Sequence, residues 1–406
     1  MVQAEKSMQN FLLQMSCILL RINLSLTRPK NANRGKYEEA LTKLQDALKI
    51  FDELGRQAEM ANSSHQIGVI HQTRGDYAAA FAAYQKALNL FEQLNDRDGV
   101  ARSQHQIGLI HQARGDYAKA WTALEKSLEL AEALNDRPGV VVTLSNLGAV
   151  AQEQGDLEKA RGFYQRSLEI ARQIGDRLAE AQLLHNLGVL AQASGEFDSA
   201  RQLYQESLSI KDELADKNGI AATLYQLGTL ARLNNDPAEA HRLFELTLKL
   251  ARESGDQSNE KRISGSLGNA AFELGVRFVN DGRWYDGLRL LEESLAIRRR
   301  SDDLDARADV ICQIARTHHL MGNVYNARTH YRDALRLYQH TANYRGMASC
   351  KNGLGRLMLE MEFFREAFEE LEQAVQIYHH LGDDHRIREI EELLQPLHHN
   401  RVEQMA

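Results

Sequence analysis

Apolar residues along the chain recur with the spacing of short amphipathic helices, and the same pattern returns every 40 residues. One copy shows two such stripes, separated by a polar turn: Leu144, Leu147 and Ala151, followed by Leu157, Ala160, Tyr164 and Leu168. Because steps of three, four and seven residues place side chains on one face of a helix, each copy is predicted to form two helices. The pattern therefore predicts an all-α protein built from repeated helix pairs.

Two ladders of small residues mark the repeat. The first ladder places a turn signal at Gly35, Gly75, Gly115, Gly155 and Gly195, with an alanine five residues after each. The second ladder keeps the same step: Gly68, Gly108, Gly148, Gly188, Gly228 and Gly268. Two ladders in register identify one structural unit copied many times. Aspartates such as Asp156 follow the turns and are predicted to cap the next helix, since a carboxylate accepts its free N–H groups.

The phase of the repeat shifts once, by seven residues, after Gly268. Seven residues are nearly two helical turns and rotate the helix face by only about 20°. One interpretation is a longer helix in which Phe272, Val276 and Val279 form an apolar contact stripe that the array covers incompletely. The alternative is that Gly275 breaks the helix and the extra residues fold back into the core.

Charge and composition exclude several classes of function. The formal net charge is -7, so the chain lacks the basic field of a protein that binds a nucleic-acid backbone. Three cysteines without CxxC spacing predict neither a disulfide framework nor a zinc site. The window 11–26 is too short and polar for a membrane span, so we expect a cytoplasmic protein. The four prolines are all expected at helix edges.

The residue types at fixed positions within each repeat resemble those of a known family. An apolar residue and a glycine are followed by alanine, an aromatic residue and a small residue, as in Leu187-Gly188, Ala200, Tyr204 and Ser207. This pattern resembles the tetratricopeptide repeat family in its longer form, as in kinesin light chain, Pins-family arrays and bacterial sensor arms. The resemblance implies a right-handed α-solenoid of antiparallel helix pairs, in which the first helix of each pair forms the inner wall.

The domain organisation follows from this repeat. Residues 1–34 do not match it and are predicted to be a degenerate capping helix or a junction. Residues 35–384 are predicted to hold a half repeat and eight helix pairs, with the insertion in the sixth pair. Residues 385–406 are expected to form a C-terminal capping helix and tail.

The resemblance also implies that side chains of the first helices line a peptide-binding groove: His65, Gln66, His105, Gln106, Asn146, Gln152, His185, Asn186, Tyr225, Gln226, Arg232, Asn269, Gln313, Arg316, Asn352 and Arg356. Asn or Gln recurs at one repeat position in six copies, and each amide both donates and accepts hydrogen bonds. Such an amide row could bind the backbone of an extended peptide, join neighbouring repeats or face solvent.

Charged groups on the same helices leave further alternatives open. Arg232, Arg262, Arg316 and Arg356 could hold acidic groups of a ligand or pair with nearby carboxylates. His65 and His71 are six residues apart, which does not bring two rings to one metal ion, and no metal site is predicted. The cluster from His379 to His385 is interpreted as a solvated loop.

No motif of catalysis is present in the sequence. It contains no phosphate loop, no GxSxG turn and no HExxH helix. The chain is therefore predicted to be no enzyme and to need no cofactor. Three hypotheses remain: a scaffold or adaptor that binds a protein or extended peptide, the ligand-sensing arm of a larger signal-transduction protein, and a solenoid that associates with itself.

Overall fold

The computed structural model describes residues 34–403, and side chains at residue 35 and from 37 to 397. The predicted N-terminal cap or junction, 1–34, therefore lies outside the described residues except for its last position. The chain divides into two compact units, residues 1–223 (unit 1) and 224–406 (unit 2), and the boundary falls within one helix. Each unit is described by itself.

The described part of the chain is helical throughout and contains no strand, so the all-α prediction is confirmed. Unit 1 contains α2 (Arg34–Glu53), α3 (Gln57–Thr73), α4 (Tyr77–Gln93), α5 (Arg97–Ala113), α6 (Tyr117–Ala133), α7 (Arg137–Glu153), α8 (Leu157–Ile174), α9 (Arg177–Ala193) and α10 (Phe197–Glu213). The boundary lies in α11 (Lys217–Leu233). Unit 2 continues with α12 (Pro237–Ser254), α13 (Gln257–Asn280), α14 (Trp284–Arg298), α15 (Leu304–Leu320), α16 (Val324–Thr341), α17 (Tyr344–Glu360), α18 (Phe364–Leu381) and α19 (Asp384–Glu403).

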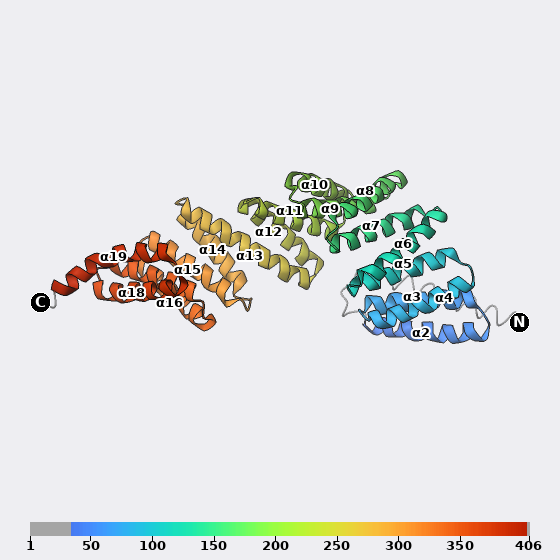
Figure 1. The fold of residues 1–406 in the computed structure, drawn as a ribbon, viewed down its shortest axis with the longest axis horizontal. Coiled ribbons are helices and arrows are strands. Elements are labelled where there is room, and N and C mark those ends of the chain that lie inside the picture. Colours follow the sequence, from blue (N-terminus) through green and yellow to red (C-terminus); the bar gives the residue numbers. More distant parts are fainter. Residues whose placement is uncertain (1–33, 404–406) are drawn as a thin grey trace. The chain divides into compact units, whose positions relative to one another are not determined.

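Successive helices lie side by side in chain order within each unit (Figure 1). The most extensive packing joins the two helices of a pair, such as α3 with α4 and α15 with α16. Gly155 lies in the turn after α7 and has a positive φ of +82°. The side chain of Asp156 accepts a hydrogen bond from the backbone N–H of Lys159 at 3.2 Å and so caps α8. The predicted turn and cap are thus confirmed at this position.

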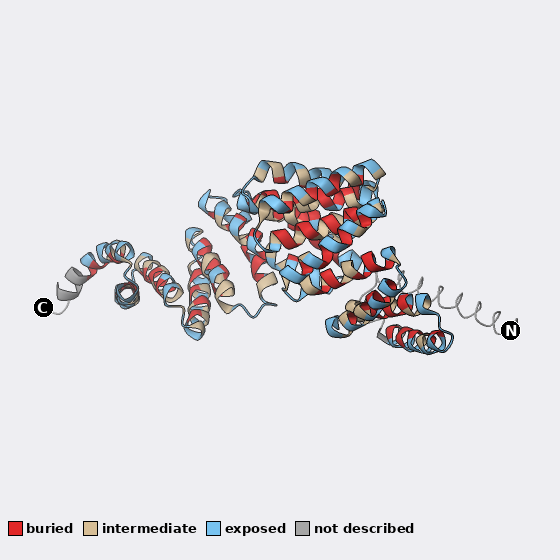
Figure 2. Ribbon diagram, turned by 45° about the vertical axis from the view of Figure 1, so that its right-hand side comes forward, coloured by how far each residue is buried: buried red, intermediate tan, exposed pale blue. Residues whose placement is uncertain are grey.

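Small residues let the paired helices approach closely. A Cβ atom at Gly148 would lie 2.6 Å from the ring of Tyr164. Ser167 is fully buried and its Oγ donates to the backbone oxygen of Val141 at 2.8 Å. Ser207 repeats this bond one copy later, to Ala181 at 2.7 Å. The buried residues consequently line the sides of the helices that face their neighbours (Figure 2).

The insertion lengthens α13, which runs for 24 residues without a break at Gly275. Val279 is 3% exposed, and Phe272 and Val276 pack in the same cluster, against Leu291. Of the predicted contact stripe, α14 and α15 thus cover Val279, whereas Phe272 and Val276 remain partly exposed, and their role as a contact surface stays a prediction. The alternative of a helix broken at Gly275 is wrong.

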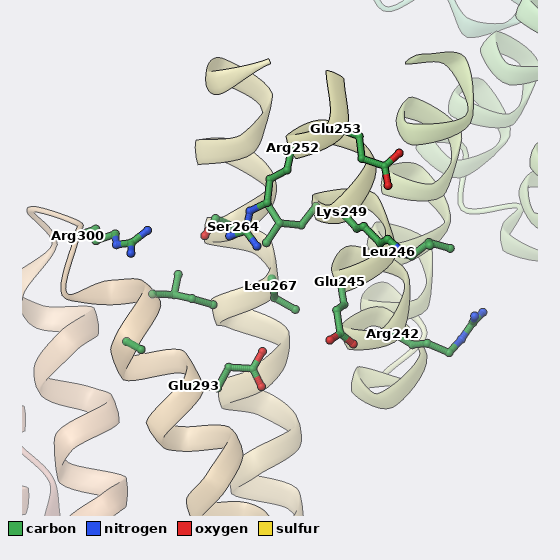
Figure 3. Close-up of a pocket in the computed structure, with 13 residues that line it drawn as sticks. Arg242, Glu245, Leu246, Lys249, Arg252, Glu253, Ser264, Leu267, Glu293 and Arg300 are labelled. Atoms are coloured by element: carbon green, nitrogen blue, oxygen red, sulfur yellow. The ribbon is translucent and has the colours of Figure 1, made fainter. Parts of the chain in front are cut away.

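The shift has a second consequence, on the other side of α13. Seven residues displace α14 along α13 by about 10 Å relative to α12. A cavity of about 830 Å³ lies between these three helices and is lined by side chains such as Glu245 and Leu246 of α12 and Glu293 of α14 (Figure 3). Leu246 is 40% exposed here, whereas the copies of its position are charged: Lys86, Lys126, Arg166 and Glu206.

Helix α19 packs against α18 and buries Ile387, Ile390 and Leu394. Pro138 and Pro237 lie in the first turns of α7 and α12, as expected. Pro396 lies inside α19, so the expectation that every proline marks a helix edge is wrong there. Its neighbours in the last two turns of α19 still include the buried Leu397.

Candidate functional site

The first helices of neighbouring pairs approach one another within each unit. Contacts join α3 with α5, α5 with α7 and α7 with α9 in unit 1, and α13 with α15 and α15 with α17 in unit 2. The solvent-facing side of these helices is called the first-helix face below. It carries most of the residues that the sequence assigns to a groove.

Polar contacts at a sequence step of 41 link three pairs of successive first helices: α5 with α7, α11 with α13 and α15 with α17. They are Asn146 with His105 (2.8 Å), Gln112 with Glu153 (3.2 Å), Tyr225 with Ser266 (3.1 Å), Arg232 with Glu273 (3.7 Å) and His319 with Glu360 (2.9 Å). The recurring step shows that two lines of side chains, on facing edges of adjacent first helices, tie successive repeats together. Part of the predicted groove is therefore occupied by contacts within the protein.

The amide row divides into bonded and free members. Asn146 donates to the ring of His105 and to the backbone oxygen of Val142, and Asn186 accepts from Gln182. The remaining amides of the row are half-buried and form no hydrogen bond with any other described residue: Gln66, Gln106, Gln226 and Gln313. Asn146 therefore joins neighbouring repeats, whereas the four glutamines keep side-chain amides that are free to bind a peptide.

Two further predicted amides have partners outside the row. Gln152 accepts the hydroxyl of Tyr164 at 3.2 Å, and Asn269 accepts the guanidinium of Arg298 at 2.9 Å. The tyrosine bond recurs in the copies at Tyr84 and Tyr204. Gln152 therefore holds the second helix of its own pair.

Three buried histidines of the first helices in unit 1 are neutral near pH 7. Burial lowers the pKa of His65, His105 and His185 to about 4 in each case. His65 is 7% exposed and packs edge-on against Tyr84, with 5.1 Å between ring centroids. These rings act as core side chains that present one edge to the face.

The four arginines also divide. Arg232 faces Glu273, and Arg356 is 2.7 Å from Glu389 and donates to Asn352. Arg262 lies over the ring of Tyr225, 3.9 Å from its centroid. Arg316 is exposed and forms no hydrogen bond or ion pair with another residue in the described part of the chain.

A cavity of about 910 Å³ opens on the first-helix face of unit 2, between α15, α17 and α19. It brings together four of the predicted groove residues: Gln313, Arg316, Asn352 and Arg356. Helices α15 and α17 each contribute an arginine to this common space, with α19 at its edge. This cavity is the candidate site of the protein.

The sequence analysis missed several contributors to this cavity, among them Tyr331, Arg386 and Glu389. Tyr331 belongs to a second helix, α16, and reaches the face between α15 and α17. Arg386 and Glu389 lie on α19, which was expected to be a cap. The repeat step does place α19 as the next first helix, and this signal could have identified both residues.

A pair of thiols lies at the wall of the cavity. Sγ of Cys312 is 3.7 Å from Sγ of Cys350, which is fully buried behind it. The Cys350 thiol donates to Cys312, and this bond lowers the pKa of Cys312 and raises that of Cys350. Of the two thiols, the one on the side of the cavity, Cys312, is therefore the more acidic.

Searches for other kinds of site concern only the described residues. Among them, no three His, Cys, Asp or Glu side chains gather so that they could hold a metal ion. No helix of this part combines the length and the apolar character needed to cross a bilayer. His379 and His380 are exposed at the end of α18.

The sequence pattern of one known family matches the chain repeat by repeat. The tetratricopeptide repeat matches residues 31–93, 59–133, 99–173, 139–213, 179–253 and 307–380. The chain belongs to the tetratricopeptide repeat family. The stretch between the last two matches contains α13, with its insertion, and α14. No curated protein matches the chain in sequence.

Solved structures share the fold of this tetratricopeptide repeat protein. A Rap protein complexed with competence and sporulation factor has 14% identity and a TM-score of 0.53, covering 82% of this chain and 88% of that one. RapI in its apo form has 15% identity and a TM-score of 0.51, covering 70% and 98%. The signal transduction ATPase with a tetratricopeptide repeat sensor from Pyrococcus horikoshii has 16% identity and a TM-score of 0.52, covering 91% of this chain and 55% of that one. At these identities the likeness shows the fold alone.

Proposed function

We propose that the protein is a scaffold or adaptor that binds a protein or an extended peptide on its first-helix faces, and that it acts by binding and not by catalysis. The observation that carries the proposal is the cavity of unit 2, where Gln313, Arg316 and Asn352 meet on one face. A stack of repeats presents such a surface along its length, and its specificity depends on the side chains that line it.

The free glutamines support binding to a peptide backbone. Gln66, Gln106 and Gln313 are half-buried, and each leaves a donor and an acceptor unused among the described residues. A peptide N–H and C=O would satisfy both groups of an amide. Because a backbone contact carries no side-chain information, the amides would supply affinity, and the cavity would supply selectivity.

The likeness in fold is compatible with this proposal. One of the similar structures is a Rap protein in complex with competence and sporulation factor. A protein of similar fold therefore forms a complex with such a factor. The residues that would do so in the present chain are those of its own first helices.

The direct test is selection from a library of random peptides displayed on phage, panned against the immobilised full chain. Selected peptides are then synthesised, and their dissociation constants are measured by fluorescence anisotropy. We expect micromolar binding that weakens at least tenfold in the double variant Gln313→Ala, Asn352→Ala, or in Gln66→Ala, Gln106→Ala, depending on the unit that holds the peptide.

The matched control is Gln202→Ala, which removes an exposed amide from the second helix α10. It should leave every dissociation constant unchanged. Failure to enrich any peptide, or equal losses in the control and in both double variants, would reject the proposal.

A second candidate function is the ligand-sensing arm of a larger signal-transduction protein. Its supporting observation is the structure from Pyrococcus horikoshii, which aligns with 91% of this chain while this chain covers 55% of it. The genomic sequence around the reading frame tests this function. An ATPase domain encoded in the same frame would support it, and a stop codon directly upstream of Met1 would contradict it.

A further inference from the structure

We propose that Cys312 and Cys350 form a modification site, in which a hydroperoxide oxidises Cys312 and Cys350 then closes a reversible disulfide between α15 and α17. The inference goes beyond the proposed function and does not depend on it, because it concerns two thiols at the wall of the unit 2 cavity and not the ligand that the cavity binds. Three features of the two residues support it.

The first feature is the contact between the two sulfur atoms. Cys312 lies on α15 and Cys350 on α17, and their Sγ atoms are 3.7 Å apart. Both residues are free cysteines. A disulfide bond is about 2.0 Å long, so the two sulfur atoms need to approach each other by about 1.7 Å. Since α15 and α17 already contact each other, a movement of this size, shared between two side chains, closes the bond.

The second feature is the pair of repeat positions that the cysteines occupy. His185 and Thr223 stand at the same two positions in unit 1, also 38 residues apart, and Nδ1 of His185 lies 3.1 Å from Oγ1 of Thr223. Stacking of first helices thus brings these two positions into contact in unit 1 as well as in unit 2. An imidazole and a hydroxyl form a hydrogen bond there, whereas two thiols can also form a covalent bond by oxidation.

The third feature is the unequal exposure of the two thiols. Cys312 is half-buried and lines the cavity of about 910 Å³, and Cys350 is fully buried behind it. Hydrogen bonds from Cys350 and Ser349 lower the pKa of Cys312 against the opposing effect of burial. Because the thiolate is the form that attacks an oxidant, exposure and acidity together assign the attacking role to Cys312 and the resolving role to Cys350.

The reaction takes place in two balanced steps. In the first step the thiolate of Cys312 attacks one oxygen of the hydroperoxide and the O–O bond breaks. The leaving oxygen takes up the proton that the thiol released, and Cys312 becomes a sulfenic acid. In the second step Sγ of Cys350 attacks Sγ of Cys312, the S–S bond forms and the S–O bond breaks. The hydroxide leaves as water with the proton of the Cys350 thiol. The two thiols together lose two electrons, which reduce one hydrogen peroxide to two molecules of water.

The disulfide would join the two helices that provide arginines to the cavity. Arg316 lies four residues after Cys312 on α15, and Arg356 lies six residues after Cys350 on α17. Oxidation therefore fixes the spacing of these two helices at the wall of the cavity, and a thiol reductant releases it.

The test uses the full chain with Cys17→Ser, in which Cys312 and Cys350 are the two remaining cysteines. The folded protein is treated with hydrogen peroxide, and the products are analysed by intact mass and by peptide mapping without reductant. We expect each chain to lose two hydrogen atoms, the map to show Cys312 joined to Cys350 within one chain, and dithiothreitol to restore both thiols.

Two further substitutions in this chain assign the roles. Cys350→Ser leaves Cys312 without its resolving partner, so its sulfenic acid should persist and be labelled by dimedone. Cys312→Ser is the matched control: it keeps only the buried thiol, which should react with hydrogen peroxide at least tenfold more slowly. In urea the two variants should react at equal rates, because unfolding exposes both thiols.

Circular dichroism and the melting temperature show whether each variant is folded, and Cys350→Ala replaces Cys350→Ser if the serine variant is not. Loss of both thiols without the linked peptide, a disulfide that joins two chains, or a sulfenic acid on Cys350 would overturn the inference. Equal rates for the two folded variants would overturn it as well, since the packing around the pair would then not direct the reaction.

Discussion

In unit 1 the hydroxyls of Tyr84, Tyr164 and Tyr204 donate to glutamines of the first helix, whereas Tyr331 occupies the same repeat position in unit 2 and has no partner. The difference begins one helix away, where His319 replaces the glutamine and turns to Glu360. A repeat position therefore fixes where a side chain lies and leaves its chemistry to its neighbours. The same repeated backbone supplies hydrogen-bonded phenols in unit 1 and a phenol without a partner in unit 2.

The arginines show the same contrast within unit 2. Arg356 and Arg316 are copies of one position, one repeat apart. Arg356 is neutralised by Glu389 of α19, and Arg316 meets no carboxylate. Unsatisfied groups thus mark the candidate site more sharply than residue type does. The chain's two tryptophans, Trp121 in unit 1 and Trp284 in unit 2, allow each unit to be followed separately.

The largest expected effect is acid unfolding of unit 1. The folded pKa of His65, His105 and His185 is about 4, below the usual value of about 6.5. Between these values the unfolded chain binds more protons, so the free energy of unfolding is complete above pH 6.5 and falls as the pH drops toward 4, by up to about 3 kcal/mol per ring. Trp121 fluorescence in a Trp284→Phe chain should report this transition.

The control for this prediction is Trp284 fluorescence in a Trp121→Phe chain. Burial also lowers the pKa of His318 in unit 2. Because this is one histidine against three in unit 1, the Trp284 transition should occur at a lower pH and with a smaller loss of stability. His105→Gln should flatten the pH dependence of unit 1. An earlier acid transition in unit 2 would break the contrast between the two faces.

The second effect concerns an exception inside unit 1. Lys211 is 1% exposed and its Nζ donates to Thr223 at 2.9 Å, whereas the copies of its position are Phe91, Ala131 and Ala171. Burial lowers the pKa of Lys211 to about 8. Lys211→Leu should therefore stabilise unit 1 by about 1 to 2 kcal/mol at pH 7, measured by urea unfolding of the Trp121 reporter.

The gain from Lys211→Leu should shrink as the pH rises from 7 to 10. A lysine with a lowered folded pKa binds fewer protons folded than unfolded in this interval, so the wild type gains stability as the pH rises toward the unfolded value. A constant difference across the interval would show that the charge of Lys211 is not the cause.

The third effect separates the two tyrosines directly. Tyr164→Phe removes a hydrogen bond and leaves Gln152 without its donor, so it should destabilise unit 1 by about 1 kcal/mol. Tyr331→Phe removes a hydroxyl that has no partner, and the stability of unit 2 should stay the same or rise slightly. Urea unfolding followed at Trp121 and Trp284 checks both values. Equal losses would show that Tyr331 has a partner in solution.

The smallest effect divides the amide row. Asn146→Ala breaks the bond to His105 and should cost about 0.5 to 1 kcal/mol in urea unfolding, whereas Gln66→Ala should stay within about 0.5 kcal/mol of the wild type. A double-mutant cycle with His105→Ala should assign most of the Asn146 loss to this pair. If Gln66→Ala costs as much as Asn146→Ala, the free amides also join repeats.

The fold could be predicted because every copy repeats the same local signals. Glycine and aspartate at each turn, and apolar residues at helical spacing, act within about 20 residues of each other. They fixed the helix pairs, the caps such as Asp156, and the continuation of the pattern through the insertion. Even so, the cover over Val279 was not predicted, because the positions of α14 and α15 over α13 depend on packing between helices.

The sequence alone thus determined which residues stand on the first helices, since position within a repeat is a matter of counting. Only the tertiary structure decided which of those side chains form contacts within the protein and which remain free. Whether an amide, a guanidinium or a phenol finds a partner depends on distances of a few ångströms between side chains some 10 to 50 positions apart in the chain, as the pairs His105 with Asn146 and Arg356 with Glu389 illustrate. Local patterns do not encode such distances, and the contact between Cys312 and Cys350 becomes visible only when the helices are stacked.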